Sequence, residues 1–255
     1  MSKMQLDGYE IDLVVTGYPG KSVCHGALGW STIALLRGGG RTALIDVGSF
    51  AQRKLVVDRL AVLGLAPADV THVILTHSHW DHSVNWVMFP RARVTIGGQE
   101  LDWAVREPVG SGAVPELYVE ALESSPQLRR VAAGDEALPG LVAHATPGHT
   151  PGSLVFVLSG RSHDIVFSGD AAKNRAELIS GEADLTMDAA VSRQSIAAIN
   201  ELWRRRPGSI LVPGHDVPMV LEDDRPRYLD RREAAITAWY GDDLESTTRF
   251  ELTLA

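Results

Sequence analysis

The stretch Thr76-His77-Ser78-His79-Trp80-Asp81-His82 places three imidazoles and one carboxylate within six residues. It follows the apolar run 70–75, which predicts a strand, and a loop at a strand end can gather side chains that a straight strand points to opposite faces. Burying these groups without partners would cost on the order of 1–3 kcal/mol each, whereas a divalent cation makes them bonded ligands. The pattern therefore predicts a metal site, and the alternative is a solvated polar loop.

Three later segments carry further ligand types, each at a turn that follows an apolar run. His149 lies in a turn rich in proline and glycine, Asp170 follows Gly169 at the end of the run 165–168, and His215 follows Pro213-Gly214. Together these seven residues exceed the four ligands of one tetrahedral site, so we expect two divalent metal ions per chain. The single cysteine, Cys24, excludes an intrachain disulfide and a cysteine-rich zinc module.

The HxHxDH run followed by separate His, Asp and His residues resembles the metallo-β-lactamase superfamily, and the match extends in order over most of the chain. The resemblance implies an α/β fold, an αββα sandwich with the site at the loop-bearing edge between two mixed sheets. Asp46 resembles the supporting acid of the family, which would orient an imidazole by accepting its other N–H. The resemblance implies one metal on His77, His79 and His149, a second on Asp81, His82 and His215, and Asp170 as a bridge between them.

Two cations that share a carboxylate would hold a bridging water whose pKa falls toward neutrality, so that hydroxide attacks an electrophilic carbonyl. Asp81 would then carry a proton to the leaving group. Family members with an Asp rather than a Cys in the second site include lactonases, thioester hydrolases and phosphodiesterases, so Asp170 argues against a dedicated β-lactamase. We expect Zn²⁺, with Mn²⁺ and iron as alternatives, because His and carboxylate ligands accept all three.

The segment 170–173 and the Gly-His-Asp ending at Asp216 most resemble the N-acyl-homoserine lactonase branch, which implies a lactone substrate. That branch commonly has a Tyr three residues after the bridging Asp, whereas this chain has Lys173. A cation there would stabilise an oxyanion or bind a substrate carboxylate, and the alternative is a solvated lysine. We therefore predict a lactone hydrolase with Asp81, Asp170 and Lys173 as catalytic residues.

Other functions stay open beside the lactonase hypothesis. A thioester hydrolase of the glyoxalase II type and a phosphodiesterase or nuclease share the ligand pattern, and the stretch 77–90 also resembles mammalian metallo-β-lactamase-domain proteins of uncertain substrate. A diiron redox module of this fold usually needs a flavin domain, for which 255 residues leave no room. The formal net charge of −8 disfavours a nucleic-acid partner, so we expect a small-molecule substrate.

Apolar runs between Gly-rich turns predict the strands that position these residues. They lie at 11–15, 32–36, 42–47 and 70–75 in the first half, and at 141–145, 154–158, 165–168 and 209–212 in the second. Ser49 is predicted to cap a helix that ends near Gly64, and a long helix is predicted from 189 to 205. We expect one domain over residues 1–255, with a lid or excursion at 109–130 and an irregular loop at 17–29 near the site.

No run reaches the roughly 18 apolar residues needed to cross a bilayer, and the N-terminus lacks a basic and apolar leader. We therefore expect a cytoplasmic protein without a membrane partner, and we leave a homodimer open. Four other histidines are interpreted as structural or unassigned: His25, His72, His144 and His163. Trp80 and, next, Trp30 are interpreted as pocket walls, and the other tryptophans as core anchors: Trp86, Trp103, Trp203 and Trp239.

Overall fold

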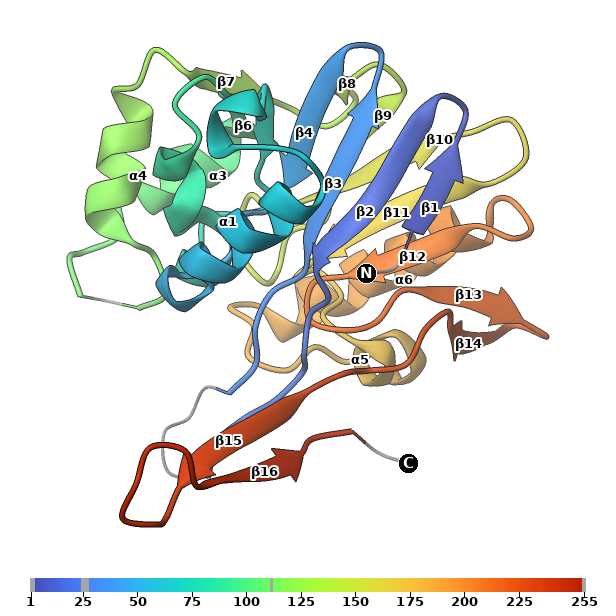
Figure 1. Ribbon diagram of the computed structural model, residues 1–255. Coiled ribbons are helices and arrows are strands. Elements are labelled where there is room, and N and C mark those ends of the chain that lie inside the picture. The colour runs from blue at the N-terminus through green and yellow to red at the C-terminus, as the bar shows by residue number, and fades with distance from the viewer. Residues whose placement is uncertain (1–2, 24–27, 111, 254–255) are drawn as a thin grey trace.

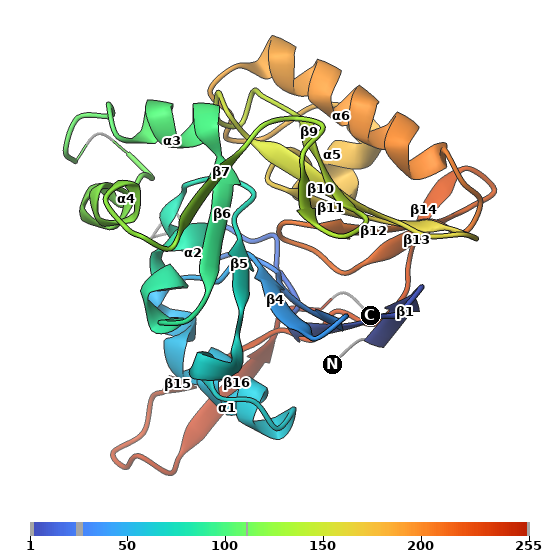
Figure 2. The ribbon, with the colours of Figure 1, turned by 90° about the horizontal axis from the view of Figure 1, so that it is seen from above.

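The computed structural model describes residues 3–23, 28–110 and 112–253. Within these ranges the chain forms two large sheets stacked face to face, with helices on both outer faces (Figure 1). Seen from above, α6 lies over the second sheet, and α3 and α4 lie beside the first (Figure 2). The αββα layering expected from the sequence is therefore confirmed.

The first sheet is built from the N-terminal half of the chain. Its strand order follows the sequence, and β4, β5, β6 and β7 run parallel to one another. The strands are β1 (Lys3–Leu6), β2 (Tyr9–Val15), β3 (Ile33–Gly38), β4 (Arg41–Ile45), β5 (His72–Ile74), β6 (Arg93–Gly97) and β7 (Leu128–Val131).

The second sheet repeats this mixed arrangement with the C-terminal half. Its strand order also follows the sequence, and β11 and β12 form a parallel pair among antiparallel neighbours. The strands are β8 (Glu136–Leu138), β9 (Leu141–Ala145), β10 (Leu154–Ser159), β11 (Asp164–Gly169), β12 (Ile210–Pro213), β13 (Met219–Glu222) and β14 (Arg225–Tyr228).

The helices cover the outer faces because each buries an apolar stripe against a sheet. In α6, Ile196, Ile199 and Trp203 recur at helical spacing and are buried, and the Asp188 side chain caps the first turn. The helices are α1 (Arg53–Val62), α2 (Trp80–Ser83), α3 (Gly98–Ala104), α4 (Glu116–Glu123), α5 (Arg175–Ser180) and α6 (Ala189–Arg204), with short 3₁₀ turns at Phe50–Gln52, Pro67–Asp69 and Val84–Met88.

Three apolar layers hold the sandwich together. Leu36, Ile74 and Phe156 belong to the layer between the two sheets. A second layer joins the first sheet to its helices, and a third joins the second sheet to α5 and α6. Both faces of the central strands are therefore buried, which is why β11 reads as a continuous apolar run rather than as an alternation.

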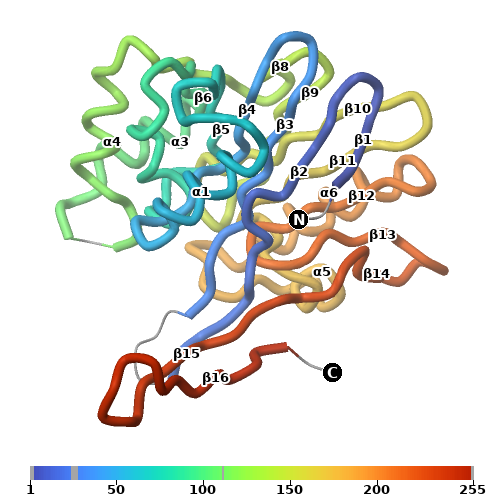
Figure 3. Tube along the Cα trace, in the orientation of Figure 1, coloured from blue at the N-terminus to red at the C-terminus, as the bar shows by residue number. Residues whose placement is uncertain are grey.

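The C-terminal part of the chain adds a feature that the apolar runs did not predict. Strands β15 (Ala235–Trp239) and β16 (Thr247–Glu251) form a separate two-stranded sheet. The tube in Figure 3 shows this hairpin projecting from the sandwich. The interpretation of Trp239 as a core anchor is wrong, because Trp239 lies on this hairpin and is 56% exposed.

The stretch 109–130 contains α4 and the first residues of β7, apart from residue 111, which lies outside the described ranges. Val119 and Leu122 of α4 are buried in the layer outside the first sheet, and β7 pairs with β6. The segment therefore packs against the body, and Ala113, among its described residues, lines the pocket described below. The described residues include no helix long and apolar enough to cross a membrane.

Candidate metal centre

Strand direction brings the predicted ligands to one edge of the sandwich. Because β4 and β5 are parallel, Asp46 and His77 leave the first sheet at the same edge. The parallel pair β11 and β12 delivers Asp170 and His215 in the same way. Strand β10 runs antiparallel to β11, so the turn between β9 and β10, which carries His149, lies at that edge as well.

The HxHxDH run turns from an extended loop into the short helix α2. His77 lies in the loop after β5, His79 precedes α2, and Asp81 and His82 lie within the helix. The backbone N–H of Trp80 donates to the carbonyl of Ala113, 2.9 Å away, which ties the run to the segment after α3. This change of conformation lets closely spaced side chains converge instead of alternating between faces.

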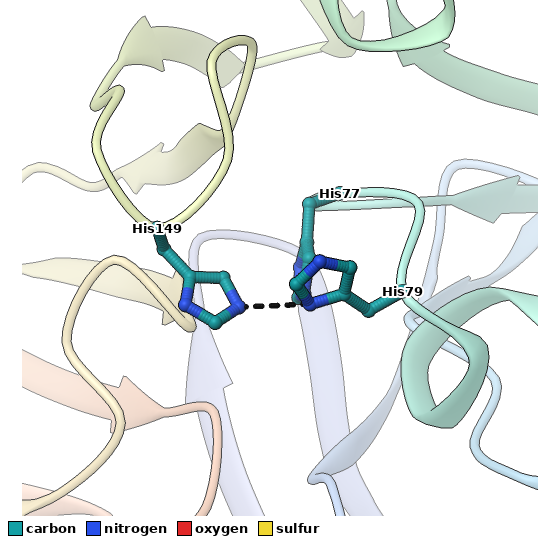
Figure 4. A group of neighbouring side chains, drawn as sticks. All are labelled: His77, His79 and His149. Atoms are coloured by element: carbon teal, nitrogen blue, oxygen red, sulfur yellow. Dashed lines mark hydrogen bonds between the residues drawn. The ribbon is translucent and has the colours of Figure 1, made fainter. Parts of the chain in front are cut away.

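The seven predicted ligands converge into three overlapping groups. Within each group the potential ligand atoms lie within 4.8 Å of one another. Figure 4 shows the first group, in which the imidazoles of His77 and His79 face His149. The groups are His77, His79 and His149; His77, His82 and Asp170; and Asp81, His82 and His215.

The separations within these groups suit a tetrahedral divalent cation. His149 Nε2 lies 3.0 Å from His79 Nδ1, and His82 Nε2 lies 3.2 Å from His215 Nε2. Two nitrogen ligands at zinc bond lengths and a tetrahedral angle lie about 3.4 Å apart. His77 Nε2 is buried without a hydrogen-bond partner among the described residues, so it is a donor atom that a cation would satisfy.

The carboxylate of Asp170 lies between the two outer groups. Its Oδ1 is 3.0 Å from His82 Nε2 and 3.2 Å from His215 Nε2, whereas Oδ2 is 3.3 Å from His149 Nε2. Asp81 Oδ2 lies 3.4 Å from His215 Nε2. One oxygen of Asp170 therefore faces each group, which is the geometry a bridging ligand requires.

The outer nitrogens of the imidazoles are held by neighbouring groups. His82 Nδ1 lies 2.7 Å from Asp46 Oδ2, and Asp46 also accepts from the backbone N–H and the hydroxyl of Thr76, both at 2.8 Å. His149 Nδ1 lies 3.1 Å from the carbonyl of Leu185. Such contacts fix the ring orientation and the tautomer that leaves a lone pair for metal.

Burial and charge set the protonation of the cluster. Burial lowers the pKa of His79 to about 4 and that of His149 to about 3, so both rings are neutral at pH 7. Burial also acts on His82, but Asp170, Asp81 and Asp46 outweigh it and raise its pKa. The imidazoles of the first group are therefore ready to ligate, and those around Asp170 sit in a field of negative charge that suits a cation.

A pocket of about 670 Å³ opens directly over the cluster, a volume suited to a small organic ligand. The metal groups contribute its floor, and Trp80, which is 39% exposed, contributes one wall. Pro19, Lys21 and Gly29 line it from the irregular loop, which therefore lies beside the site as expected. Residues 24–27, which include His25 and Cys24, lie outside the described residues.

Lys173 is a wall of this pocket and not a solvated surface lysine. Its side chain is 12% exposed, and Nζ lies 3.0 Å from Glu177 Oε1. Glu177 also accepts hydrogen bonds from the backbone N–H groups of Lys173 and Asp184, at 2.7 and 2.8 Å. No sequence pattern indicates this buried ion pair, because lysine and glutamate are usually exposed.

The remaining histidines and tryptophans differ in whether they belong to the ligand groups, the core or the pocket. His72, His144 and His163 belong to none of the ligand groups found among the described residues. Trp86 and Trp203 are buried in the core. Trp30 stacks on Tyr18, with ring centroids 4.8 Å apart, and does not line the pocket above the cluster. The interpretation of Trp30 as a pocket wall is therefore wrong for this pocket.

A further functional candidate missed by the sequence analysis is Glu100 of α3. Its residue is completely buried, and both of its oxygens accept hydrogen bonds from the loops that carry His77, His79 and His149. A single glutamate outside any predicted element gives no sequence signal of such a role.

Comparison with known proteins agrees with this geometry. The family model described as "Metallo-beta-lactamase superfamily" matches residues 29–215. The metallo-beta-lactamase domain-containing protein 1 of Xenopus laevis is 31% identical over 178 residues, which cover 69% of this chain and 67% of that protein. An N-acyl homoserine lactonase of Bacillus thuringiensis is 24% identical over 166 residues, 64% of this chain and 62% of that protein.

Solved structures share the fold at low sequence identity. The dizinc quorum-quenching lactonase AidC superimposes with a TM-score of 0.73 at 16% identity, covering 90% of this chain and 97% of that one. A metallo-beta-lactamase from Thermotoga maritima gives a TM-score of 0.66 at 21% identity, covering 84% and 100%. A ribonuclease of Thermus thermophilus is 31% identical in sequence over 158 residues, which cover 57% of this chain and only 36% of that protein.

Proposed function

The chain belongs to the metallo-β-lactamase superfamily, and on that premise we propose that it is a binuclear metal-dependent hydrolase of lactones. The observation that carries the proposal is the pocket of about 670 Å³, whose floor is the ligand cluster and whose walls include Trp80 and Lys173. A space of this size admits a small acyl or ring-bearing molecule and brings its carbonyl to the cluster.

The proposed ligand sets correspond to the groups of ligand atoms described above. One cation would lie within the three-histidine group, a second within the group of Asp81, and Asp170 would bind both with its two oxygens. Zn²⁺ is the proposed ion, with Mn²⁺ and iron as alternatives. When bound, such cations supply Lewis acidity and make water a nucleophile at neutral pH.

The protein residues around the cluster have distinct proposed tasks. Asp81 lies at the boundary between cluster and pocket, so its carboxylate can carry a proton to the leaving oxygen of the opened ring. Lys173 lines the same pocket, and its Nζ, which is buried and makes no hydrogen bond among the described residues, would donate one to negative charge that develops on the substrate. Trp80 excludes water from one side and packs against the apolar part of the substrate.

The net charge of the chain favours a small-molecule substrate over a phosphate polymer. The whole chain has a formal charge of −8. A nucleic acid would gain no electrostatic steering from such a surface. A thioester hydrolase of the glyoxalase II type remains the second candidate, because the same cluster and pocket admit a thioester carbonyl.

Turnover of a fixed panel tests the proposal. Lactones, thioesters, bis-p-nitrophenyl phosphate and β-lactams are offered to the same purified, metal-loaded sample, with Asp170→Asn as a control for contaminating hydrolases. We expect the lactone to give the highest kcat/KM. A higher kcat/KM for the phosphodiester would reject the lactonase, and a higher kcat/KM for the thioester would establish the second candidate instead.

A further inference from the structure

The three-histidine group is assembled from both halves of the sandwich. His77 and His79 follow β5 of the first sheet, whereas His149 lies between β9 and β10 of the second. Its geometry therefore depends on how firmly the two loops are held to each other, and not only on the conformation of each loop. A backbone hydrogen bond of 3.0 Å from Leu154 N to the carbonyl of Thr76 provides one link.

Glu100, in the first turn of α3, provides a second and stronger link. One oxygen, Oε1, accepts from the backbone N–H and the hydroxyl of Ser78, at 2.8 and 2.7 Å. The other, Oε2, accepts from the hydroxyl of Thr150 at 2.7 Å and from the backbone N–H of Gly152 at 3.1 Å. Ser78 stands between His77 and His79, and Thr150 follows His149, so one carboxylate holds all three ligand-bearing positions.

The packing around Glu100 leaves little room for another arrangement. Glu100 is completely buried, and the four hydrogen bonds that it accepts fill the accepting capacity of a carboxylate. A Cβ at Gly152 would approach the backbone N of Glu100 to 2.1 Å, so the loop of His149 rests directly on the first turn of α3. This contact is possible only because position 152 is a glycine.

We propose that Glu100 is a positioning residue that sets the spacing of the three-histidine group and thereby its affinity for metal. The inference rests on the proposed metal-dependent function, but Glu100 itself contacts none of the ligand atoms. It acts through Ser78 on one loop and through Thr150 and Gly152 on the other. Charge-assisted hydrogen bonds are the stronger kind, so one buried carboxylate holds the two loops more firmly than neutral contacts would.

Glu100→Gln is the direct test because it keeps the size and removes the charge. Whichever way the amide lies, its NH₂ faces the backbone N–H of either Ser78 or Gly152, and a backbone N–H cannot turn round to accept. The matched control is Asp164→Asn. Asp164 is also a completely buried acid and accepts from Gly160 and Arg205, but it lies at the opposite end of β11 from Asp170, about 20 Å away at 3.3 Å per residue.

Both variants and the wild type are stripped of metal, and their thermal unfolding is recorded. The dissociation constants for two equivalents of Zn²⁺ are then measured by competition with a chromophoric chelator, and Co²⁺ spectra report the coordination geometry. We expect Glu100→Gln to raise one of the two dissociation constants about 10- to 100-fold, which is the range found for residues that orient metal ligands. Asp164→Asn is expected to leave both constants and the Co²⁺ spectrum unchanged at a similar loss of Tm.

Thr150→Val keeps the test decisive if Glu100→Gln does not fold. It removes one of the four hydrogen bonds that Glu100 accepts without changing the shape of the Thr150 side chain. We expect it to raise the same dissociation constant by a smaller factor than Glu100→Gln does. If the folded Glu100 and Thr150 variants bind Zn²⁺ with wild-type dissociation constants, the inference is overturned. It is also overturned if Asp164→Asn raises the dissociation constant as much as they do. A wild-type protein that binds no metal would instead reject the proposed function, and this inference with it.

Discussion

Replacing Asp46 by Asn tests whether metal binding by the group of Asp81, His82 and His215 depends on the tautomer of His82. In the wild type, Asp46 Oδ2 lies 2.7 Å from His82 Nδ1, and the other contacts of the carboxylate are donors on Thr76. A carboxylate can only accept at neutral pH, so it holds the proton on Nδ1 and leaves Nε2 free to ligate. An amide NH₂ at the same place would instead donate to Nδ1 and move the proton to Nε2.

The magnitude follows from the contact that is lost. A hydrogen bond to a charged group contributes about 1.5–3 kcal/mol, which corresponds to roughly 12- to 140-fold in an equilibrium constant. We therefore expect Asp46→Asn to weaken the binding of one Zn²⁺ ion by one to two orders of magnitude and to reduce hydrolysis at limiting metal. Chelator competition measures the first effect, and a zinc titration of turnover measures the second.

Asp12→Asn is the matched control for this experiment. Asp12 is also buried, and its carboxylate pairs with Arg37 Nη2 at 2.8 Å on β2. We expect this variant to lose stability but to keep the wild-type affinity for zinc. Equal zinc affinities in Asp46→Asn and the wild type would refute the tautomer argument. If Asp46→Asn and Asp12→Asn lose the same zinc affinity, Asp46 acts only by stabilising the fold.

Further predictions concern metal content, the bridge, the pocket cation and the core. Protein purified without chelator should contain about two metal ions per chain by elemental analysis, and a content of zero after metal addition would contradict the assignment. Asp170→Asn should keep the wild-type circular dichroism spectrum but lose most turnover, because an amide is a poor bridge between two cations. Lys173→Ala should lower kcat and kcat/KM together by roughly 100-fold, whereas a rise in KM alone would assign it to ground-state binding. Trp203→Ala should lower the free energy of unfolding by about 3–5 kcal/mol in urea denaturation, since Trp203 is buried against the second sheet.

Several strands could be predicted from the sequence because they coincide with runs of mostly apolar residues. The predicted run 141–145 coincides with β9, and the runs 154–158 and 165–168 each lie within a strand that extends by one or two residues. The strands β1, β6 to β8 and β13 to β16 were not predicted. Each has only three to five residues, and some carry many polar residues, such as the Thr and Arg residues of β16. Their pairing depends on neighbours and on turns that periodicity does not describe.

The ligand residues could be chosen from the sequence because His and Asp are rarely dense at strand ends. Their grouping required the structure, since His149 comes within 3.0 Å of His79 only through the packing of one sheet on the other. The role of Asp46 was expected from a family pattern, and its contact with His82 agrees with it. Glu100 carried no such pattern, because burial and four donors are properties of the folded chain and not of its helix.

The ion pair of Lys173 and Glu177 limits what the pocket cation can do. Since Glu177 already neutralises Lys173 at 3.0 Å, a substrate carboxylate would find a pair of zero net charge rather than a free cation. Attraction to a fully charged ground state is therefore weak, whereas a hydrogen bond to an oxygen that becomes negative only in the transition state costs no reorganisation of the pair. Because Glu177 also binds the backbone N–H of Asp184, the same carboxylate joins the loop after β11 to the loop that carries Leu185. The pair thus favours a role of Lys173 in kcat, and it connects that role to the loop that orients His149.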